Sequence, residues 1–206
     1  MNLLLINGIY DETTLKTLQD QGVHSFGFDL RGRSPNLIPY SKLDQLLTKL
    51  KNSHVVLTFQ NDNSTTVLSF LSLLDKHQRQ FSLLFRDQLP ATYYENLNKD
   101  FYWMFHPDGD WQSILALPRL KGLFLPLKWQ MHYQNIPKLW EMIENRRLDI
   151  FIHADRFSEI GIASTTNDIN LSVDLSNEVE SSYRSIDQGR LQRMRIWRGK
   201  NESLAI

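Results

Sequence analysis

Polar and ionisable residues follow the short apolar runs of this sequence, at the points where strands would end. They are Asn7, Asp29, Arg31, Gln60, Asn61, Arg86, Asp87, His106, Asp108, Lys128, His153, Asp155, Asp174 and Ser176. The histidines His106 and His153 titrate near neutral pH, so they are candidates for moving a proton. Asp29 and Asp155 add carboxylates for general acid–base work. His153 and Asp155 supply only two metal ligands, too few for a zinc site, so no metal or cofactor is expected.

Three further positions among these strand ends suggest binding or structural roles. Arg31 and Lys128 are the cations best placed to meet an anionic ligand. Asp174 stands where a strand turns into a loop, and an Asp in that place usually accepts hydrogen bonds from backbone N–H groups. Near the C-terminus, the segment Arg190–Lys200 carries five basic residues. We interpret it as a solvated face, and in second place as a surface for an acidic partner.

Composition excludes several classes of protein. The 206 residues include 23 Lys plus Arg and 23 Asp plus Glu, so the net charge is zero and no basic surplus is available for nucleic acid. The aromatic run Phe101–Phe105 has no interleaved cation, which predicts a buried strand rather than a platform for bases. Cysteine is absent, so disulfides, thiolate metal sites and thiol nucleophiles are excluded. With no signal peptide and no run of about 18 apolar residues, we expect a cytoplasmic protein that binds no membrane.

Eight short apolar runs alternate with longer amphipathic stretches. The runs are Leu3–Ile6, Ser25–Leu30, Val55–Phe59, Phe81–Phe85, Phe101–Phe105, Gly122–Leu127, Ile150–Ile152 and Leu171–Leu175. Several are apolar throughout, as in strands that are covered on both faces. Helical spacing marks residues 13–20, 40–51, 66–76, 137–145 and 191–197. Ser41 is the expected cap of the second helix, and Pro137 suits the first turn of the fourth.

This alternation predicts a parallel α/β fold. Eight units of about 26 residues each fit a single closed (β/α)8 barrel, a TIM barrel, over residues 1–206. An open doubly wound sheet is the rival, and it would more often have about five to seven strands. We therefore predict one closed barrel whose first strand lies beside its eighth.

Segments near both ends of the chain and one in its middle carry a resemblance to a known family. Residues 5–9 read L-I-N-G-I, residues 24–28 read H-S-F-G-F with R-S-P at 33–35, and residues 173–181 read V-D-L-S-N-E-V-E-S. The chain resembles the phosphoribosylanthranilate isomerase family of tryptophan biosynthesis, whose strands typically read K-I-C-G-I, G-F-V-F followed by S-P-R, and V-D-V-S-S-G-V-E-S. The D-Q-L-P of residues 87–90 is similar to the family's D-E-x-P. The resemblance implies a (β/α)8 barrel and an Amadori rearrangement of a phosphoribosyl amine by an acid–base pair.

The residues that this reaction requires are replaced. In the family, the base is the Cys of the first strand, and the matching residue here is Asn7. The family's acid is an Asp at the end of the sixth strand, which falls at about Pro126. An amide has no useful pKa for proton transfer, and residues 122–140 contain no carboxylate. The resemblance therefore implies a degenerate pair of catalytic positions.

The family's ligand site is only partly kept. The substrate-binding Arg of S-P-R is Asn36 here, and the family's A-G-G-L after the seventh strand is replaced by A-D-R at residues 154–156. The eighth strand keeps Asp174 and Ser176 but has Asn177 and Glu178 in place of Ser-Gly. We expect a small ligand at the mouth of the barrel to contact Arg31, Asn36, Lys128, Asp174 and Ser176.

Two functions stay open. The first is an isomerase-like barrel that is weakly active or non-catalytic and binds a small molecule, phosphorylated or not, or a protein partner. The second is a functional isomerase, of this or a related sugar phosphate, that uses His106, Asp29 and Asp155 as substitute acid–base groups. The replaced pair at Asn7 and Pro126 favours the first. A monomer and a homodimer both fit the sequence.

Overall fold

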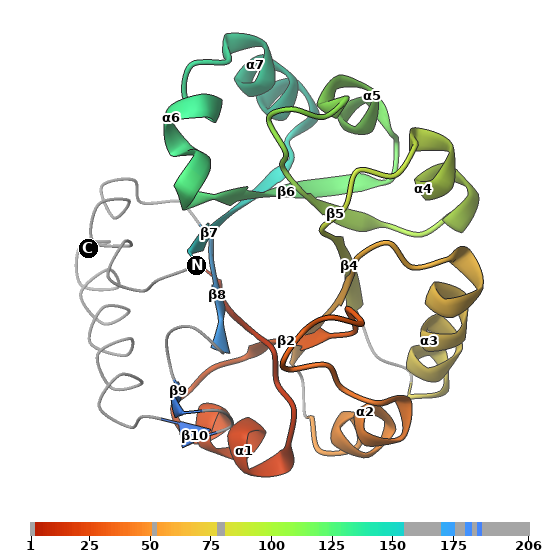
Figure 1. Ribbon diagram of the computed structural model, residues 1–206, viewed down its shortest axis with the longest axis vertical. Helices are drawn as coiled ribbons and strands as arrows, with labels where there is room; N and C mark the ends of the chain where they lie inside the picture. The colour runs from red at the N-terminus through yellow and green to blue at the C-terminus, as the bar shows by residue number, and fades with distance from the viewer. Residues whose placement is uncertain are drawn as a thin grey trace.

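Eight parallel strands close into one barrel, as predicted (Figure 1). The computed structural model describes residues 3–50, 53–77, 81–154, 170–175, 180–182 and 185–186. The barrel strands are β1 (Leu4–Asn7), β2 (Ser25–Asp29), β3 (His54–Phe59), β4 (Phe81–Phe85), β5 (Phe101–Met104), β6 (Leu120–Pro126), β7 (Asp149–Ala154) and β8 (Asn170–Asp174). β8 pairs with β1 and sets Asn7 beside Asp174, which excludes the open sheet.

Helices surround the barrel (Figure 1). They are α1 (Glu12–Asp20), α2 (Tyr40–Leu47), α3 (Ser64–Lys76), α4 (Ala91–Leu97), α5 (Trp111–Ala116), the 3-10 turn η1 (Leu127–Trp129), α6 (Gln130–Tyr133) and α7 (Pro137–Arg146). Two further short strands, β9 (Glu180–Ser182) and β10 (Ser185–Ile186), pair with each other outside the barrel. The helices predicted at 13–20, 40–51, 66–76 and 137–145 are confirmed as α1, α2, α3 and α7, and the one at 191–197 lies outside the described residues.

Two details of the helix ends test the predicted capping. Pro137 occupies the first turn of α7, as expected, because its fixed φ suits that position. The prediction for Ser41 is wrong, since α2 already begins at Tyr40 and its cap is Pro39, which offers no side-chain hydrogen bond. Asp11 and Asn63 cap α1 and α3 instead, with side chains that accept the N–H groups of Thr14 and Thr66.

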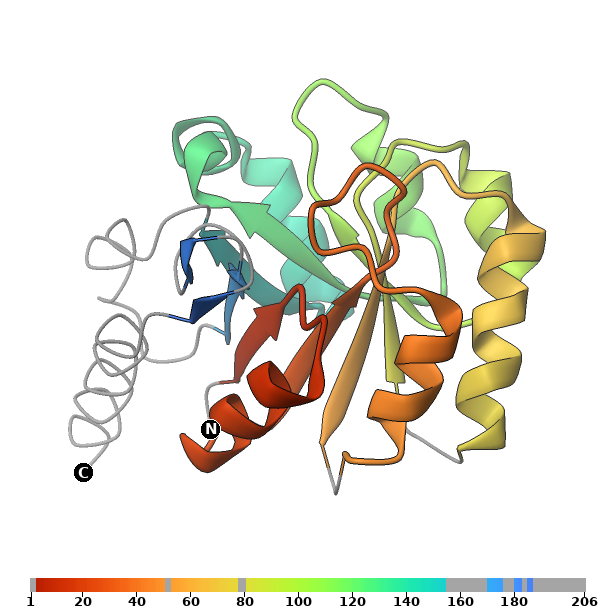
Figure 2. The same cartoon turned by 60° about the horizontal axis from the view of Figure 1, so that its bottom comes forward.

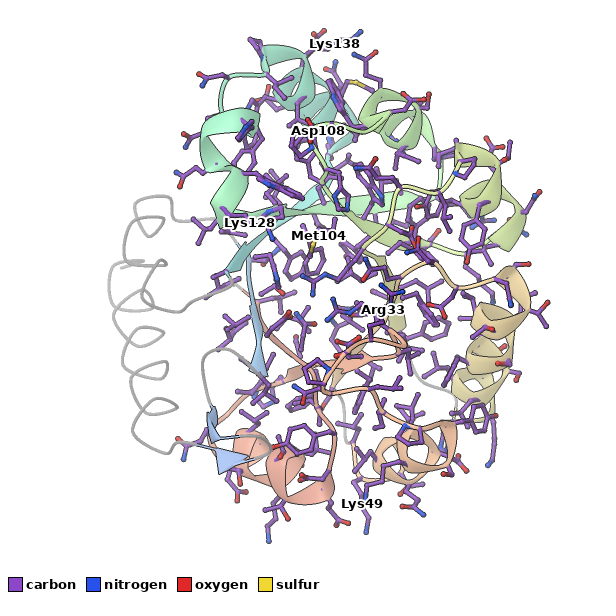
Figure 3. All side chains as sticks on the ribbon, viewed as in Figure 1. Arg33, Lys49, Met104, Asp108, Lys128 and Lys138 are labelled. Atoms are coloured by element: carbon purple, nitrogen blue, oxygen red, sulfur yellow. The ribbon has the colours of Figure 1, made fainter. Side chains whose placement is uncertain are left out.

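The strands have two buried faces, as their continuous apolar runs predict. Alternate residues such as Ile6 and Leu57 pack outward against the helices. The other alternate residues form an apolar layer inside the barrel, made of Leu5, Val56, Leu84, Met104, Phe124 and Phe151. Figure 3 shows Met104 near the centre of the ring, with Lys49 and Lys138 at the periphery. This internal layer divides the barrel into a mouth, at the carboxyl ends of the strands, and a base at their amino ends.

Candidate functional site at the barrel mouth

The mouth gathers the residues that end the strands, as predicted for a barrel of this kind. In Figure 2 the loops after β2 and β5 rise above this end, opposite the N-terminus. Asn7 follows Leu5 by two positions, His153 follows Phe151, and Asp174 follows Ser172. Because side chains alternate along a strand, all of them point into the barrel above the apolar layer. Polar groups therefore fill the mouth end of the interior.

A hydrogen-bonded chain links five of these side chains, which we call the mouth network: Asn7, Arg86, His153, Ser172 and Asp174. Asn7 Nδ2 donates to Ser172 Oγ at 2.7 Å, and His153 Nδ1 lies 3.2 Å from the same oxygen. Arg86 donates to Asp174 Oδ2 at 2.9 Å, and its other amino group lies 3.3 Å from His153 Nε2. Arg86 thus joins the carboxylate of Asp174 to the His153 end of the network.

The protonation state of His153 follows from these partners. A guanidinium nitrogen only donates, so His153 Nε2 must accept from Arg86. Its proton is then on Nδ1, which donates to Ser172. The competing approach of Nε2 to Asp174 Oδ2 measures 3.8 Å, which is too long for a hydrogen bond. In this arrangement His153 is a hydrogen-bonded part of the barrel interior, with Nε2 toward Arg86 and Nδ1 toward Ser172.

Asp174 is held as a carboxylate. Its burial by itself would raise its pKa, but positive charge from His153 when protonated, and from Arg86 and Arg31, outweighs burial and lowers the pKa well below its ordinary value. Among the described residues, Oδ2 of Asp174 accepts from the Arg86 side chain, and Oδ1 accepts no hydrogen bond. Residues 176–179, which would supply the backbone N–H groups expected to bind Asp174, lie outside the described residues, so that expectation stays a prediction. Because its pKa is lowered, Asp174 carries no proton to give near neutral pH.

Asp29 and Arg31 form a second, self-contained unit beside the network. Arg31 Nε donates to Asp29 Oδ1 at 2.8 Å, and its amino group donates to Oδ2. Ser34 Oγ donates to Asp29 Oδ2 at 2.6 Å. Both oxygens of this buried carboxylate are therefore occupied, so Asp29 positions Arg31 and the β2–α2 loop. The outer N–H groups of Arg31 remain directed away from Asp29.

Three buried oxygen acceptors around the end of β1 lack a hydrogen bond: Oδ1 of Asn7, Asn36 and Asp174. The Asn7 oxygen lies directly over Gly27, where an added Cβ would come within 2.1 Å of it. The Asn36 amide packs on Gly8 in the same way, 2.9 Å from the position of an added Cβ. A buried acceptor without a donor is destabilising by about 1–3 kcal/mol, so these three atoms require an explanation.

His106 and Lys128 lie on the β5 and β6 side of the mouth. The His106 ring lies between Trp103, at 5.7 Å, and Trp129, at 5.2 Å, and its Nε2 donates to the Arg86 carbonyl at 3.2 Å. Burial lowers the pKa of His106, although the Arg86 carbonyl and Asp87 act in the opposite direction. Lys128 is exposed, and its Nζ lies 5.2 Å from the centre of the Trp129 ring.

The remaining predicted residues separate into three groups. Pro126 is the last residue of β6 and pairs in register with His153, so this strand end presents no carboxylate. Asp87 is buried and accepts from Tyr94 Oη at 2.6 Å and from the Asn61 N–H at 2.7 Å, which makes it structural. Asp155 and Ser176 lie outside the described residues, as does the basic segment 190–200.

The central role of Arg86 was not predicted from the sequence, and neither was the link from His153 through Ser172. Arg86 directly follows the apolar strand Phe81–Phe85, and a charged residue at the inward position after such a strand is the signal that could have identified it. Ser172 is the inward residue two places before Asp174. Within the described part of the chain, no three His, Asp or Glu residues group as a metal site requires. None of its helices is long and apolar enough to cross a membrane.

Solved structures that share this architecture include several phosphoribosylanthranilate isomerases. The enzyme from Thermus thermophilus is 14% identical, with a TM-score of 0.70 over 96% of this chain and 98% of its own. The enzyme from Thermotoga maritima is 15% identical, with a TM-score of 0.66 over 97% and 99%. A third, in complex with reduced 1-(o-carboxyphenylamino)-1-deoxyribulose 5-phosphate, is 13% identical, with a TM-score of 0.69 over 95% and 97%.

The sequence alone shows less similarity than the fold. No protein-family model matches it, and no curated protein matches it. At 13–15% identity, the structural likeness establishes a shared architecture and leaves activity to be argued from the residues themselves. The chain has the (β/α)8 fold of the phosphoribosylanthranilate isomerases over nearly its whole length.

Proposed function

We propose that this protein binds a small hydroxylated molecule at the barrel mouth and does not perform the proton transfers of phosphoribosylanthranilate isomerase. The observation that carries the proposal is the polar interior of the barrel mouth, where ionised side chains pair with one another while three buried acceptors have no donor. Such a site matches a ligand that brings hydrogen-bond donors rather than one that exchanges protons.

The case against the isomerase reaction rests on the two family positions. Asn7 offers an amide, and its Nδ2 is engaged by Ser172. Pro126 has no titratable group. The nearby carboxylates of Asp29, Asp87 and Asp174 are held by Arg31, Tyr94 and Arg86 respectively. Removing a general acid or base typically slows a reaction by about 10²–10⁴-fold, and here both are replaced.

The ligand class follows from the unsatisfied acceptors. Hydroxyl groups can donate to Oδ1 of Asn7, Asn36 and Asp174, and they can also accept from the outer N–H groups of Arg31. A small rearrangement of these side chains is needed, because the three oxygens are fully covered in this structure. The structural neighbour with a bound deoxyribulose 5-phosphate derivative accommodates a hydroxylated chain of this kind. Among the described residues, the outer N–H groups of Arg31 and the exposed Lys128 are the cations that a ligand's anionic group could contact.

His106 supports a second candidate function, an isomerase that uses substitute residues. Its lowered pKa keeps the imidazole neutral near pH 7, and with Nε2 donating to Arg86 its Nδ1 is the basic nitrogen. Of the other two substitutes, Asp29 is occupied by Arg31 and Ser34. Asp155 lies outside the described residues.

Thermal unfolding with added ligands tests binding. We expect ribose, ribulose 5-phosphate or a related polyol to raise the melting temperature, because a ligand that binds only the folded state stabilises it. Inorganic phosphate alone should have no effect. Asn36→Leu should abolish the shift, whereas Asn98→Leu, at the exposed end of α4, should leave it unchanged. Equal shifts in both variants, or a response to phosphate alone, would contradict the proposal.

Complementation of a tryptophan auxotroph that lacks the isomerase tests the reaction. We expect no growth without tryptophan, and no activity of the purified protein above background. Growth at ordinary expression would overturn the non-catalytic assignment in favour of the second function. His106→Ala would then be the decisive variant, since loss of a general base should lower kcat by at least about 100-fold.

A further inference from the structure

Four polar side chains lie at the base of the barrel, on the opposite side of the apolar layer from the mouth. We call His54, Ser82, Tyr102 and Asp149 the basal cluster. They occupy the first or second position of β3, β4, β5 and β7. His54 Nε2 lies 2.9 Å from Ser82 Oγ, Ser82 is hydrogen-bonded to Tyr102, and Tyr102 Oη donates to Asp149 Oδ2 at 2.8 Å. The contacts form a continuous chain across this end.

Gly122 allows the last link of the chain. Tyr102, Gly122 and Asp149 are register neighbours on β5, β6 and β7. Because Gly122 has no side chain, the Tyr102 phenol reaches across β6 to the Asp149 carboxylate. An added Cβ at Gly122 would come within 2.3 Å of the Asp149 carbonyl oxygen, so β6 and β7 could not keep their present approach.

The direction of the chain is fixed by its carboxylate end. Asp149 can only accept, so Tyr102 donates to it, and the Tyr102 oxygen is left to accept from the Ser82 hydroxyl. Ser82 has then used its one hydrogen, so it accepts from His54 Nε2–H. This places the proton of neutral His54 on Nε2. Its Nδ1 is bare and buried, with no hydrogen-bond partner.

We propose that His54 is a proton-sensitive brace that holds the base of the barrel together while it is neutral. A second proton would have to go to Nδ1, where no acceptor meets the new N–H. The protonated ring must therefore either remain unsatisfied or turn and break its bond to Ser82. When the pH falls below the range in which histidine ordinarily titrates, this brace weakens. The amino ends of β3 and β4 then lose the hydrogen bond that joins His54 to Ser82.

The groups that face His54 agree with this assignment. From the β2 side, the His24 carbonyl accepts the His54 backbone N–H. From β4 and β5 come the Ser82 hydroxyl and the Tyr102 phenol, whose pKa is raised by burial and by Asp149, so both are uncharged. Burial lowers the pKa of His54, and the charge of Asp149 on β7 opposes that effect only in part. A histidine whose folded pKa is lowered contributes stability above its unfolded pKa and loses it as pH falls through the folded pKa.

Urea unfolding of the full chain between pH 8 and pH 5 tests the brace. His54→Gln keeps an amide N–H that can donate to Ser82 but cannot titrate. We expect the unfolding constant of the wild type, relative to that of His54→Gln, to be level above pH 7 and to rise below about pH 6.5, by up to about tenfold per pH unit. His24→Gln, at an exposed neighbouring position, should follow the wild type. A ratio that stays level, or that falls, would overturn the proposal.

An NMR titration of the wild type decides the matter if His54→Gln does not fold. The ring nitrogens of His54 should show Nδ1 as the unprotonated position, and its pKa should lie below about 6.5. A pKa at or above that value, or a proton on Nδ1 in the neutral form, would overturn the brace.

Discussion

The two ends of the barrel interior are both polar, but they differ in where their charged side chains lie. The mouth network contains the ion pair of Arg86 with Asp174, so it buries charges of both signs. The basal cluster runs from the neutral His54 to Asp149, whose carboxylate is exposed. A buried charge that loses its partner is strongly destabilising, whereas an exposed charge is stabilised by water. The mouth should therefore respond sharply to loss of charge, and the base to geometry and pH.

The apolar layer separates the mouth network from the basal cluster, so the two can be perturbed independently. Asp149 and His153 lie on one strand, four residues apart, which corresponds to about 13 Å along β7. The stacked rings of Phe124 and Phe151, 4.6 Å apart, belong to the layer between them. Changes at positions this far apart, without shared partners, usually add.

The largest effect is expected from removing the buried cation of the mouth network, Arg86. Arg86→Met leaves the buried Asp174 carboxylate without its cation, and the loss of one partner of a buried pair costs about 3 kcal/mol or more. Urea unfolding at pH 7 measures it. Arg86→Met with Asp174→Asn should recover part of the loss, because the uncompensated charge is gone. The matched surface variant Arg119→Met, whose partner Asp100 is half exposed, should lose less than about 1 kcal/mol. Equal losses in the two variants would contradict the role given to burial of the Arg86–Asp174 pair.

Substituting one glycine at each end of the barrel by alanine compares how well the base and the mouth accommodate an added methyl group. Gly122→Ala at the base meets a backbone oxygen at 2.3 Å, which no side-chain change can relieve. We expect a loss of about 3 kcal/mol from overpacking. Gly27→Ala at the mouth first meets Asn7 Oδ1, so adding Asn7→Ala should recover part of its loss. Double-mutant unfolding measurements check this, and strict additivity of Gly27→Ala and Asn7→Ala would contradict the packing described.

Acid should affect the two ends in different pH ranges. The lowered pKa of Asp174 means that its stabilisation is present above the unfolded value of about 3.9 and is lost only as pH falls through the lower folded value. The difference in unfolding free energy between the wild type and Asp174→Asn should therefore stay level from pH 8 to pH 5 and narrow below about pH 4. Denaturation curves across this range test it. If this free-energy difference already narrows between pH 7 and pH 5, the mouth has the acid sensitivity that we predict for the base.

The smallest effect is expected at the solvent-exposed edge of the mouth, which we call the rim, where Lys128 lies. Lys128 is exposed, and its contact with Trp129 is a cation–π interaction at a solvated site. Lys128→Ala should change the unfolding free energy by less than about 1 kcal/mol. Urea unfolding beside Arg86→Met provides the measurement. A loss above about 2 kcal/mol would mean that the rim is as tightly coupled as the interior.

The strands were predictable because their signal is strong and local. All eight apolar runs became strands, since a parallel sheet inside a ring of helices buries both faces. The short helices α4 and α5 were not predicted, because Ala91–Leu97 and Trp111–Ala116 contain too few turns to show a helical stripe. The Ser41 cap failed for a related reason, since Pro39 already sets an extended residue before Tyr40.

The sequence allowed the location of the site at the barrel mouth to be predicted, but not which of its side chains pair with one another. Barrel geometry brings Asn7, Arg31, Asn36, His106 and Asp174 to one end, which strand order alone implies. Which carboxylate pairs with which cation depends on side-chain reach across strands that are far apart in sequence, such as Arg86 and Asp174, 88 positions apart. That pairing decides whether Asp174 is a proton donor or a fixed charge, so the chemistry could not be obtained from spacing.

The apolar layer also affects how such a barrel can evolve. Leu5, Val56, Leu84, Met104, Phe124 and Phe151 form a floor beneath the mouth. Residues above this floor can be exchanged, the paired charges together, while the layer and the base keep the strands in register. A lineage could thus discard one reaction and recruit another ligand without passing through an unfolded ancestor. In protein engineering, the same layer sets the depth to which a new pocket can extend before it destabilises the barrel.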